Sequence, residues 1–153
     1  MTAVQVGSLI VAIVLVSAIL SMLALSWVAR KSGRLVVSLQ AELATAGETA
    51  MRGPEPALYR GASGIRSRVK GNGAIVLTER RVLFRKLFGA DIEVPLAQLI
   101  GVKEDKWFLR AYTGGRLHMI LQLKGGDEVG FMVSDHAGWM AVMREGIAAR
   151  SPA

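Results

Sequence analysis

The residues that could carry out catalysis in this chain are few and widely spaced. Its two histidines, His118 and His136, stand alone, and the chain has no cysteine to serve as a nucleophile or a thiolate ligand. Structural and catalytic zinc sites need three or four clustered ligands. Two isolated histidines therefore predict neither a metal site nor a site for any other cofactor.

Acidic pairs and glycine-rich stretches are the remaining candidates for enzyme chemistry. A general acid and base would need paired carboxylates, and two acidic pairs lie beside predicted turns: Asp91 with Glu93, and Glu104 with Asp105. These positions favour solvated turn residues. The glycines at residues 61–64 lack the G-x-S-x-G spacing of a nucleophile elbow, and Gly71-Asn72-Gly73 lacks the rest of a dinucleotide fingerprint. We expect a protein that is not an enzyme and takes no small-molecule substrate.

Positive charge is the strongest chemical signal in the sequence. The chain has a formal net charge of +7, and residues 60–86 contain eight cations and one acid. Alternate residues of a strand share a face, so a strand over residues 57–70 would align its cations. The predicted basic face consists of Arg66, Arg68, Lys70, Arg80, Arg81 and Arg85. It would bind anionic lipid or a protein partner, or it is only solvated. Aromatic residues are too scarce, at 6%, to favour nucleic acid binding.

The N-terminal region predicts a membrane helix over residues 1–30. No charged side chain precedes Arg30, and the chain is apolar from Val4 to Val28, which exceeds the roughly 20 residues that a bilayer core requires. A cleaved signal peptide is the alternative, but it would have a cationic start and a shorter apolar core. The cations that follow the span, at residues 30–34, predict an external N-terminus and a cytoplasmic domain at the cell (inner) membrane. Trp27 fits an interfacial anchor.

The elements after the span divide into a stalk or linker over residues 31–56, a domain over residues 57–149 and a tail over residues 150–153. Apolar residues at helical spacing extend the helix to about Ala46, as a stalk or as an amphipathic helix on the membrane or on a partner subunit. Gly53-Pro54 should end regular structure. Strand-like runs between residues 57 and 133 predict about seven strands, with tight turns at Asn72-Gly73 and Glu79-Arg80. A closing helix, capped by Ser134 or Asp135, carries an apolar stripe: Trp139, Val142, Met143 and Ile147.

Residues 73–84, GAIVLTERRVLF, resemble the second and third strands of GRAM and bacterial pleckstrin-homology-like (PH-like) domains. The apolar run with its Pro-Leu step at residues 92–100, Phe131 and Trp139 also match in order. The resemblance covers residues 57–149. It implies a mainly β fold, with a bent seven-stranded barrel or sandwich capped by a C-terminal α-helix. In members that bind phosphoinositides, the cations lie where Arg66, Arg68 and Lys70 fall here, whereas other members bind proteins.

These observations together predict a single-pass, membrane-anchored accessory or adaptor protein without catalytic activity. We expect it to be a small subunit or scaffold of a membrane protein complex, which it binds through the cytoplasmic PH-like domain. The alternative is a module that binds anionic, phosphoinositide-like lipid at the inner leaflet. Membrane lipids and a membrane protein complex are the expected partners.

Overall fold

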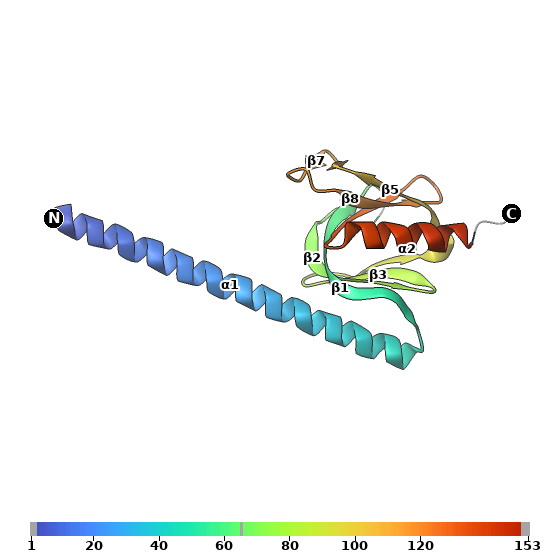
Figure 1. Ribbon diagram of the computed structural model, residues 1–153, viewed down its shortest axis with the longest axis horizontal. Helices are drawn as coiled ribbons and strands as arrows, with labels where there is room; N and C mark the ends of the chain where they lie inside the picture. Colours follow the sequence, from blue (N-terminus) through green and yellow to red (C-terminus); the bar gives the residue numbers. More distant parts are fainter. Residues whose placement is uncertain (1–2, 65, 151–153) are drawn as a thin grey trace.

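The computed structural model describes residues 3–64 and 66–150, and it consists of a very long helix followed by a β-rich domain (Figure 1). Helix α1 (Ala3–Ala46) leads into β1 (Ala50–Ala62), and the chain closes with helix α2 (His136–Ala148). Between them lie β2 (Gly71–Thr78), β3 (Arg81–Lys86), β4 (Ile92–Pro95), the 3-10 helix η1 (Leu96–Gln98), β5 (Leu99–Asp105), β6 (Trp107–Phe108), β7 (Ala111–Tyr112), β8 (His118–Leu123) and β9 (Glu128–Val133). The expected mainly β domain between an apolar helix and a C-terminal helix is confirmed.

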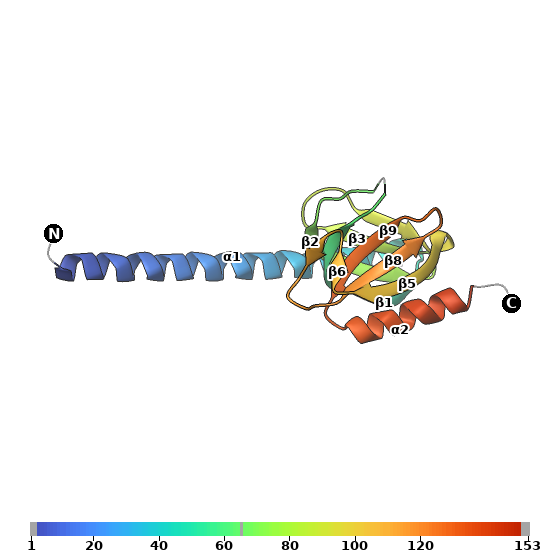
Figure 2. The same ribbon diagram turned by 90° about the horizontal axis from the view of Figure 1, so that it is seen from above.

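Helix α1 continues without a break for 44 residues, about 66 Å at 1.5 Å per residue. It is long and apolar enough to cross a membrane, judged by length and composition, and its N-terminal half projects away from the domain (Figure 2). The helix ends where predicted, because Gly47 adopts a left-handed conformation (φ 64°) and the Glu48 N–H donates to the Leu43 carbonyl. This turn sends the chain back along the helix as β1.

Seven strands form one antiparallel sheet in the order β4-β3-β2-β1-β9-β8-β5, and β6 pairs with β7 as a separate small hairpin. β1 pairs with β2 and with β9, and bulges at three places let it bend between them. The sheet is open, with β4 and β5 as its edge strands. Its curvature leaves one concave side, and α2 covers it.

The main core fills the concave side of the sheet. The rings of Tyr59, Phe84 and Phe131 meet there with centroids 5.6–5.8 Å apart. Helix α2 adds Trp139, Met140 and Met143, all buried. Asp135 caps α2 by accepting a hydrogen bond from the Gly138 N–H. The predicted stripe therefore packs on the core, but Met140, which the spacing placed off the stripe, is buried as well.

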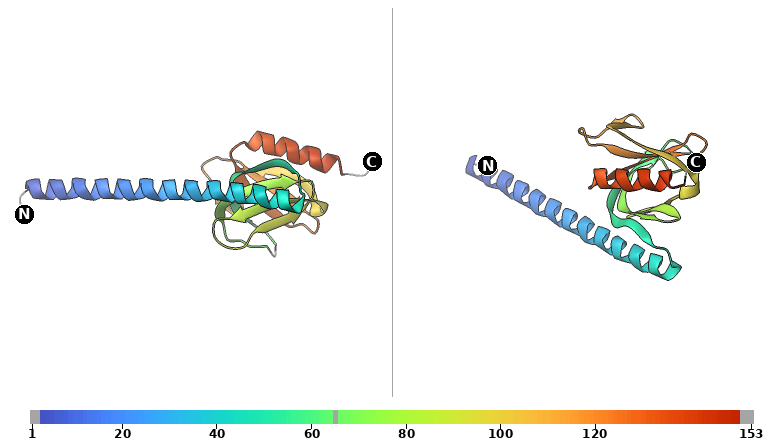
Figure 3. Two further views of the ribbon diagram at one scale, coloured as in Figure 1. Left: turned by 90° about the horizontal axis from the view of Figure 1, so that it is seen from below. Right: turned by 45° about the vertical axis from the view of Figure 1, so that its right-hand side comes forward.

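A second apolar cluster lies on the opposite side of the sheet, where the C-terminal part of α1 crosses β2 and β3 (Figure 3). Leu39 and Leu43 of α1 are buried there, and Leu35 and Val36 pack at its margin. The cluster is completed by three residues of the sheet, Ala74, Val76 and Leu83. The predicted stalk is thus neither a free helix nor a helix on the membrane, because its apolar stripe covers the chain's own sheet.

Three predictions about the first strands are wrong. β1 begins at Ala50, seven residues before the expected start, and it includes Pro54, which lies at a bulge where a ladder donor is not required. β1 ends at Ala62, and residues 66–70 form no strand. Asn72-Gly73 is no turn but part of β2, which pairs with β3 there. A Cβ at Gly73 would collide with the Arg85 carbonyl, so this strand position requires glycine.

Candidate functional site

The structure places the six residues of the predicted basic face in three different environments. Arg81 and Arg85 project from β3 towards α1 and carry ion pairs. Arg66, Arg68 and Lys70 lie on the segment after β1, which contacts Tyr59 of the main core and forms no strand that would align them. Arg80 lies exposed in the β2–β3 turn. The single aligned face that strand alternation predicted is therefore not formed.

Arg81 and Arg85 join the sheet to helix α1 and its C-terminal turn. Arg81 pairs with Glu48 at 2.7 Å and with Glu93 at 3.0 Å, and the Glu48 side chain is only 7% exposed. Arg85 pairs with Glu42 of α1 at 2.7 Å and with Asp91 at 3.0 Å. These carboxylates hold their arginines beside the apolar cluster of α1.

The pKa shifts at this junction follow from the same contacts. The hydrogen bond from Arg81 holds the pKa of Glu48 below its ordinary value, and burial only partly opposes it. The hydrogen bond to Glu48 in turn raises the pKa of Arg81. Burial acts to lower the pKa of Arg85, but its hydrogen bonds to Asp91 and Glu42 outweigh it, so the pKa is raised. Both arginines therefore stay charged and serve the joint between helix and sheet.

Hydrogen bonds from Tyr59 and Lys86 hold the segment over residues 66–70 on the main core. Tyr59 donates its phenolic hydrogen to the Ser67 carbonyl, and burial raises the pKa of that phenol to about 12. The buried Lys86 amine donates to the Val69 carbonyl at 3.0 Å and lies 4.8 Å from the centre of the Tyr59 ring. These contacts leave Arg68 and Lys70 exposed to solvent. Nothing in the sequence pattern indicated that Lys86 would be internal.

The residues proposed for acid–base or metal chemistry take structural roles. His118 is buried in β8 with Nδ1 3.1 Å from the Asp105 carbonyl, and burial lowers its pKa. His136 lies 2.8 Å from Glu104, at the start of α2. Asp91 and Glu93 are engaged by the arginines of β3. Among residues 3–64 and 66–150, no three histidine or acidic side chains are grouped so that they could hold a metal ion.

A groove of about 420 Å³ separates the edge strand β5 from the end of α2. We call it the β5 groove, and its lining residues are Leu96, Ala97, Leu99, Ile100, Lys124, Ile147 and Arg150. Ile100 is 56% exposed at its floor. Arg150 donates to the Glu79 carbonyl, whereas Lys124 makes no ion pair with the described part of the chain. The groove therefore combines an apolar floor, an open strand edge and a cation.

A cluster at the junction of α1 and the domain was not anticipated from the sequence. Trp27 stacks on Phe88 of the β3–β4 connection with ring centroids 6.2 Å apart. The Lys31 amine lies 3.8 Å from the centre of the Phe88 ring and 4.8 Å from that of Trp27. Phe88 is 68% exposed despite these contacts. The domain thus touches the helix where its uncharged segment ends.

Comparison with known proteins shows a likeness of fold and no family. No protein-family model matches the chain, and no curated protein does. Among solved structures, the C-terminal domain of an unknown protein from Leishmania infantum is similar, with a TM-score of 0.50 and 11% sequence identity. The similarity covers 72% of this chain and 95% of that chain. At this identity the likeness concerns the fold alone.

Proposed function

We propose that this chain is a single-pass membrane protein that acts as a non-catalytic adaptor or accessory subunit of a membrane protein complex. The observation that carries this proposal is the continuity of α1, whose first half suits a bilayer and whose second half packs on the sheet through Leu39 and Leu43. A domain fixed on its own membrane helix presents its surfaces at a constant height and orientation. Such rigid presentation suits a scaffold that positions a partner.

The engagement of the charged residues supports a binding role over a catalytic one. The acidic candidates Asp91 and Glu93 already neutralise arginines that hold the domain on α1. Burial inside the core lowers the pKa of His118. A catalytic acid or base must instead be free to exchange a proton with a substrate.

The domain itself we assign to the PH-like architecture, in line with the resemblance of residues 73–84 to GRAM and bacterial PH-like domains. Seven antiparallel strands, of which the first pairs with both β2 and β9, and a C-terminal helix over the concave side agree with this assignment. Closure of the sheet into a barrel would require β4 and β5 to approach, with η1 as the corner between them.

The orientation in the membrane follows from charge. Arg30, Lys31 and Arg34 directly follow the apolar segment, and none of them pairs with a carboxylate of the described chain. The positive-inside rule places these cations, and the domain after them, in the cytoplasm, with the N-terminus outside the inner membrane.

The β5 groove is the surface best suited to a protein partner. An open edge strand offers unpaired backbone groups to an added strand, and Ile100 and Leu99 offer an apolar floor beside it. Lys124 favours a partner segment that carries acidic residues. The opposite edge, β4, is shorter, ends in Pro95 and has its acidic residue in an ion pair, so it is a poor template for strand addition.

Purification from the native membrane in mild detergent tests this function. The full chain should elute with a stoichiometric protein partner. Ile100→Glu should abolish co-purification, whereas Val69→Glu, which changes another exposed β-branched aliphatic residue outside the groove, should retain it. A chain that elutes alone from its native membrane would reject the subunit role.

Recognition of anionic lipid headgroups is the second candidate function. Arg68 and Lys70 are exposed and form no ion pair within the part of the chain that the structure describes. If they bind headgroups, full-length protein in vesicles should protect them from amine and guanidine reagents only when anionic lipid is present. If Lys70 is modified at the same rate in the wild type and in an Arg66→Glu/Arg68→Glu variant, this candidate is rejected.

A further inference from the structure

The β6–β7 hairpin exposes an unusual amount of apolar surface for a short turn. The chain reverses at Leu109 and Arg110, both with positive φ (47° and 63°). A two-residue turn with this backbone normally takes Asn-Gly. The side chains of Trp107, Leu109 and Tyr112 are 58%, 40% and 52% exposed, and the Trp107 and Tyr112 rings lie 5.1 Å apart. Strained residues that display apolar side chains indicate a functional surface.

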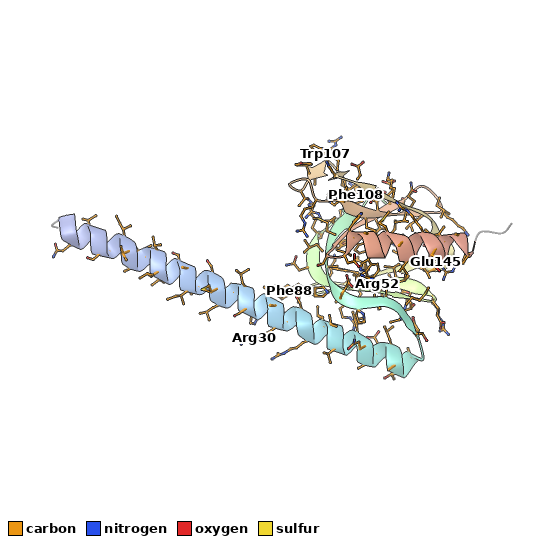
Figure 4. The ribbon with its side chains drawn as sticks, viewed as in Figure 1. Arg30, Arg52, Phe88, Trp107, Phe108 and Glu145 are labelled. Carbon is orange, nitrogen blue, oxygen red and sulfur yellow. The ribbon has the colours of Figure 1, made fainter. Side chains whose placement is uncertain are left out.

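This hairpin lies on the side of the domain that faces the N-terminal half of α1. Trp107 and Phe88 both lie along that side, with Arg30 on the neighbouring part of the helix (Figure 4). The connection from β7 to β8 reaches α1, since Arg116 and Ser32 line one shallow recess of about 200 Å³. The β2–β3 turn is at the other end of the domain, where Arg81 pairs with Glu48.

Trp27 sets the position of this side of the domain along the bilayer normal. Trp27 ends the uncharged segment of α1, where tryptophan prefers the headgroup region. Phe88 stacks on it and therefore lies at the same height. Because Leu39 and Leu43 fix the domain on α1, the hairpin keeps a constant position relative to Phe88.

The charges on this side complement an anionic surface. Lys106, Arg110 and Arg116 form no ion pair with the described residues, and they join the cations that follow the apolar segment of α1. The nearest acid, Asp105, accepts the Trp107 backbone N–H. Basic residues next to a membrane are attracted to anionic lipid, and tryptophan and tyrosine rings settle at the headgroup level.

We propose that the membrane-facing side of the domain, formed by the β6–β7 hairpin and Phe88, rests in the headgroup layer of an anionic bilayer beside its own anchor. This inference rests on the proposed membrane insertion of α1, but not on the identity of a protein partner. The hairpin and Phe88 form a second and third point of membrane contact. They hold α1 and the domain at a constant tilt to the bilayer and keep the β5 groove at a constant angle to it.

Paired spin labels test the proposal in the full chain. The protein has no cysteine, so Arg110→Cys and Arg80→Cys each create a single labelling site. Both are arginines in two-residue hairpin turns, one on the membrane-facing side and one at the far end. In vesicles of phosphatidylcholine and phosphatidylglycerol, the label at position 110 should collide several-fold less often with a water-soluble nickel chelate than the label at position 80.

The possible outcomes separate the claims. Equal collision rates at both positions would overturn the headgroup contact. This holds even if a protein covers the hairpin in native membranes, because the vesicles contain no other protein. Adding Phe88→Ser to the Arg110→Cys protein should restore part of the collision rate, and no change would remove Phe88 from the contact. Vesicles of phosphatidylcholine alone should give weaker protection at position 110, and identical protection would overturn the role of the cations. Extraction of the unlabelled chain from vesicles by alkali would instead reject membrane insertion and with it the proposed function.

Discussion

Shortening Leu39 to alanine should loosen the joint between α1 and the sheet. The Leu39 side chain has 0% exposure and packs in the cluster with Val76 and Leu83. Leucine-to-alanine changes at buried sites cost about 2–5 kcal/mol in the free energy of unfolding. This cluster is bounded by a helix that can move inward to fill the space, so we expect a value near the lower end, about 2–3 kcal/mol.

Val37→Ala is the matched control. Val37 lies two residues earlier on the same helix, is also aliphatic and is 64% exposed, so its loss should change the free energy of unfolding by less than about 0.5 kcal/mol. Denaturant unfolding of the full chain in mild detergent, followed by fluorescence, reports on the domain through the buried Trp139. Protease cleavage near Gly47 should also accelerate in Leu39→Ala. Identical unfolding and cleavage in the two variants would refute the packing of α1 on the sheet.

Three further predictions follow from individual contacts. Arg81→Gln should destabilise the protein by about 1–3 kcal/mol, because it leaves a buried carboxylate without its charged partner; in the same unfolding assay, Arg80→Gln, an exposed neighbour, should have little effect. Gly73→Ala should prevent normal pairing of β2 with β3, whereas Gly71→Ala, whose Cβ has ordinary contacts, should express and fold like the wild type in circular dichroism. Burial holds the pKa of His118 below that of the unfolded chain, so the unfolded state binds more protons as the pH falls below about 6.5. Stability should therefore decline below that pH, and a His118→Phe variant that keeps the same decline would contradict the assignment.

The sequence predicted the elements well where side-chain periodicity is decisive. The β2–β3 hairpin with its turn at Glu79 and Arg80 was predicted, as was the end of α1 at Ala46. The capped C-terminal helix with Trp139 at its core was also predicted. In these elements local propensity and packing favour the same structure, so the pattern is sufficient.

The packing of α1 on the sheet was missed although its signal was present. Residues 74–77 and 82–84 are apolar at every position, which is typical of a strand covered on both faces. Residues 35–43 of α1 carry the apolar stripe that covers the second face of these strands. Each pattern was interpreted alone, and only tertiary structure shows that they bury each other.

The candidate site was harder to predict because it depends on ion pairing and backbone geometry. Cations such as Arg81 and Arg85 look the same in sequence whether they face solvent or a carboxylate from α1. The strand predicted over residues 57–70 gave a false alignment of charges, because residues 66–70 form no strand. The exposed aromatics Phe88 and Trp107 could not be located, since strand alternation does not reveal that a run of six residues folds back on itself.

The most direct test of the account is the distance between α1 and the domain in a lipid bilayer. Spin labels at Val37→Cys and Arg80→Cys, both exposed, would report it by pulsed electron paramagnetic resonance on the full chain. If α1 and the sheet are joined as described, the distance distribution should be single and narrow, and the same in detergent and in vesicles. A broad distribution in vesicles would show that the domain moves freely on its tether, and it would contradict the proposal of a rigidly mounted scaffold.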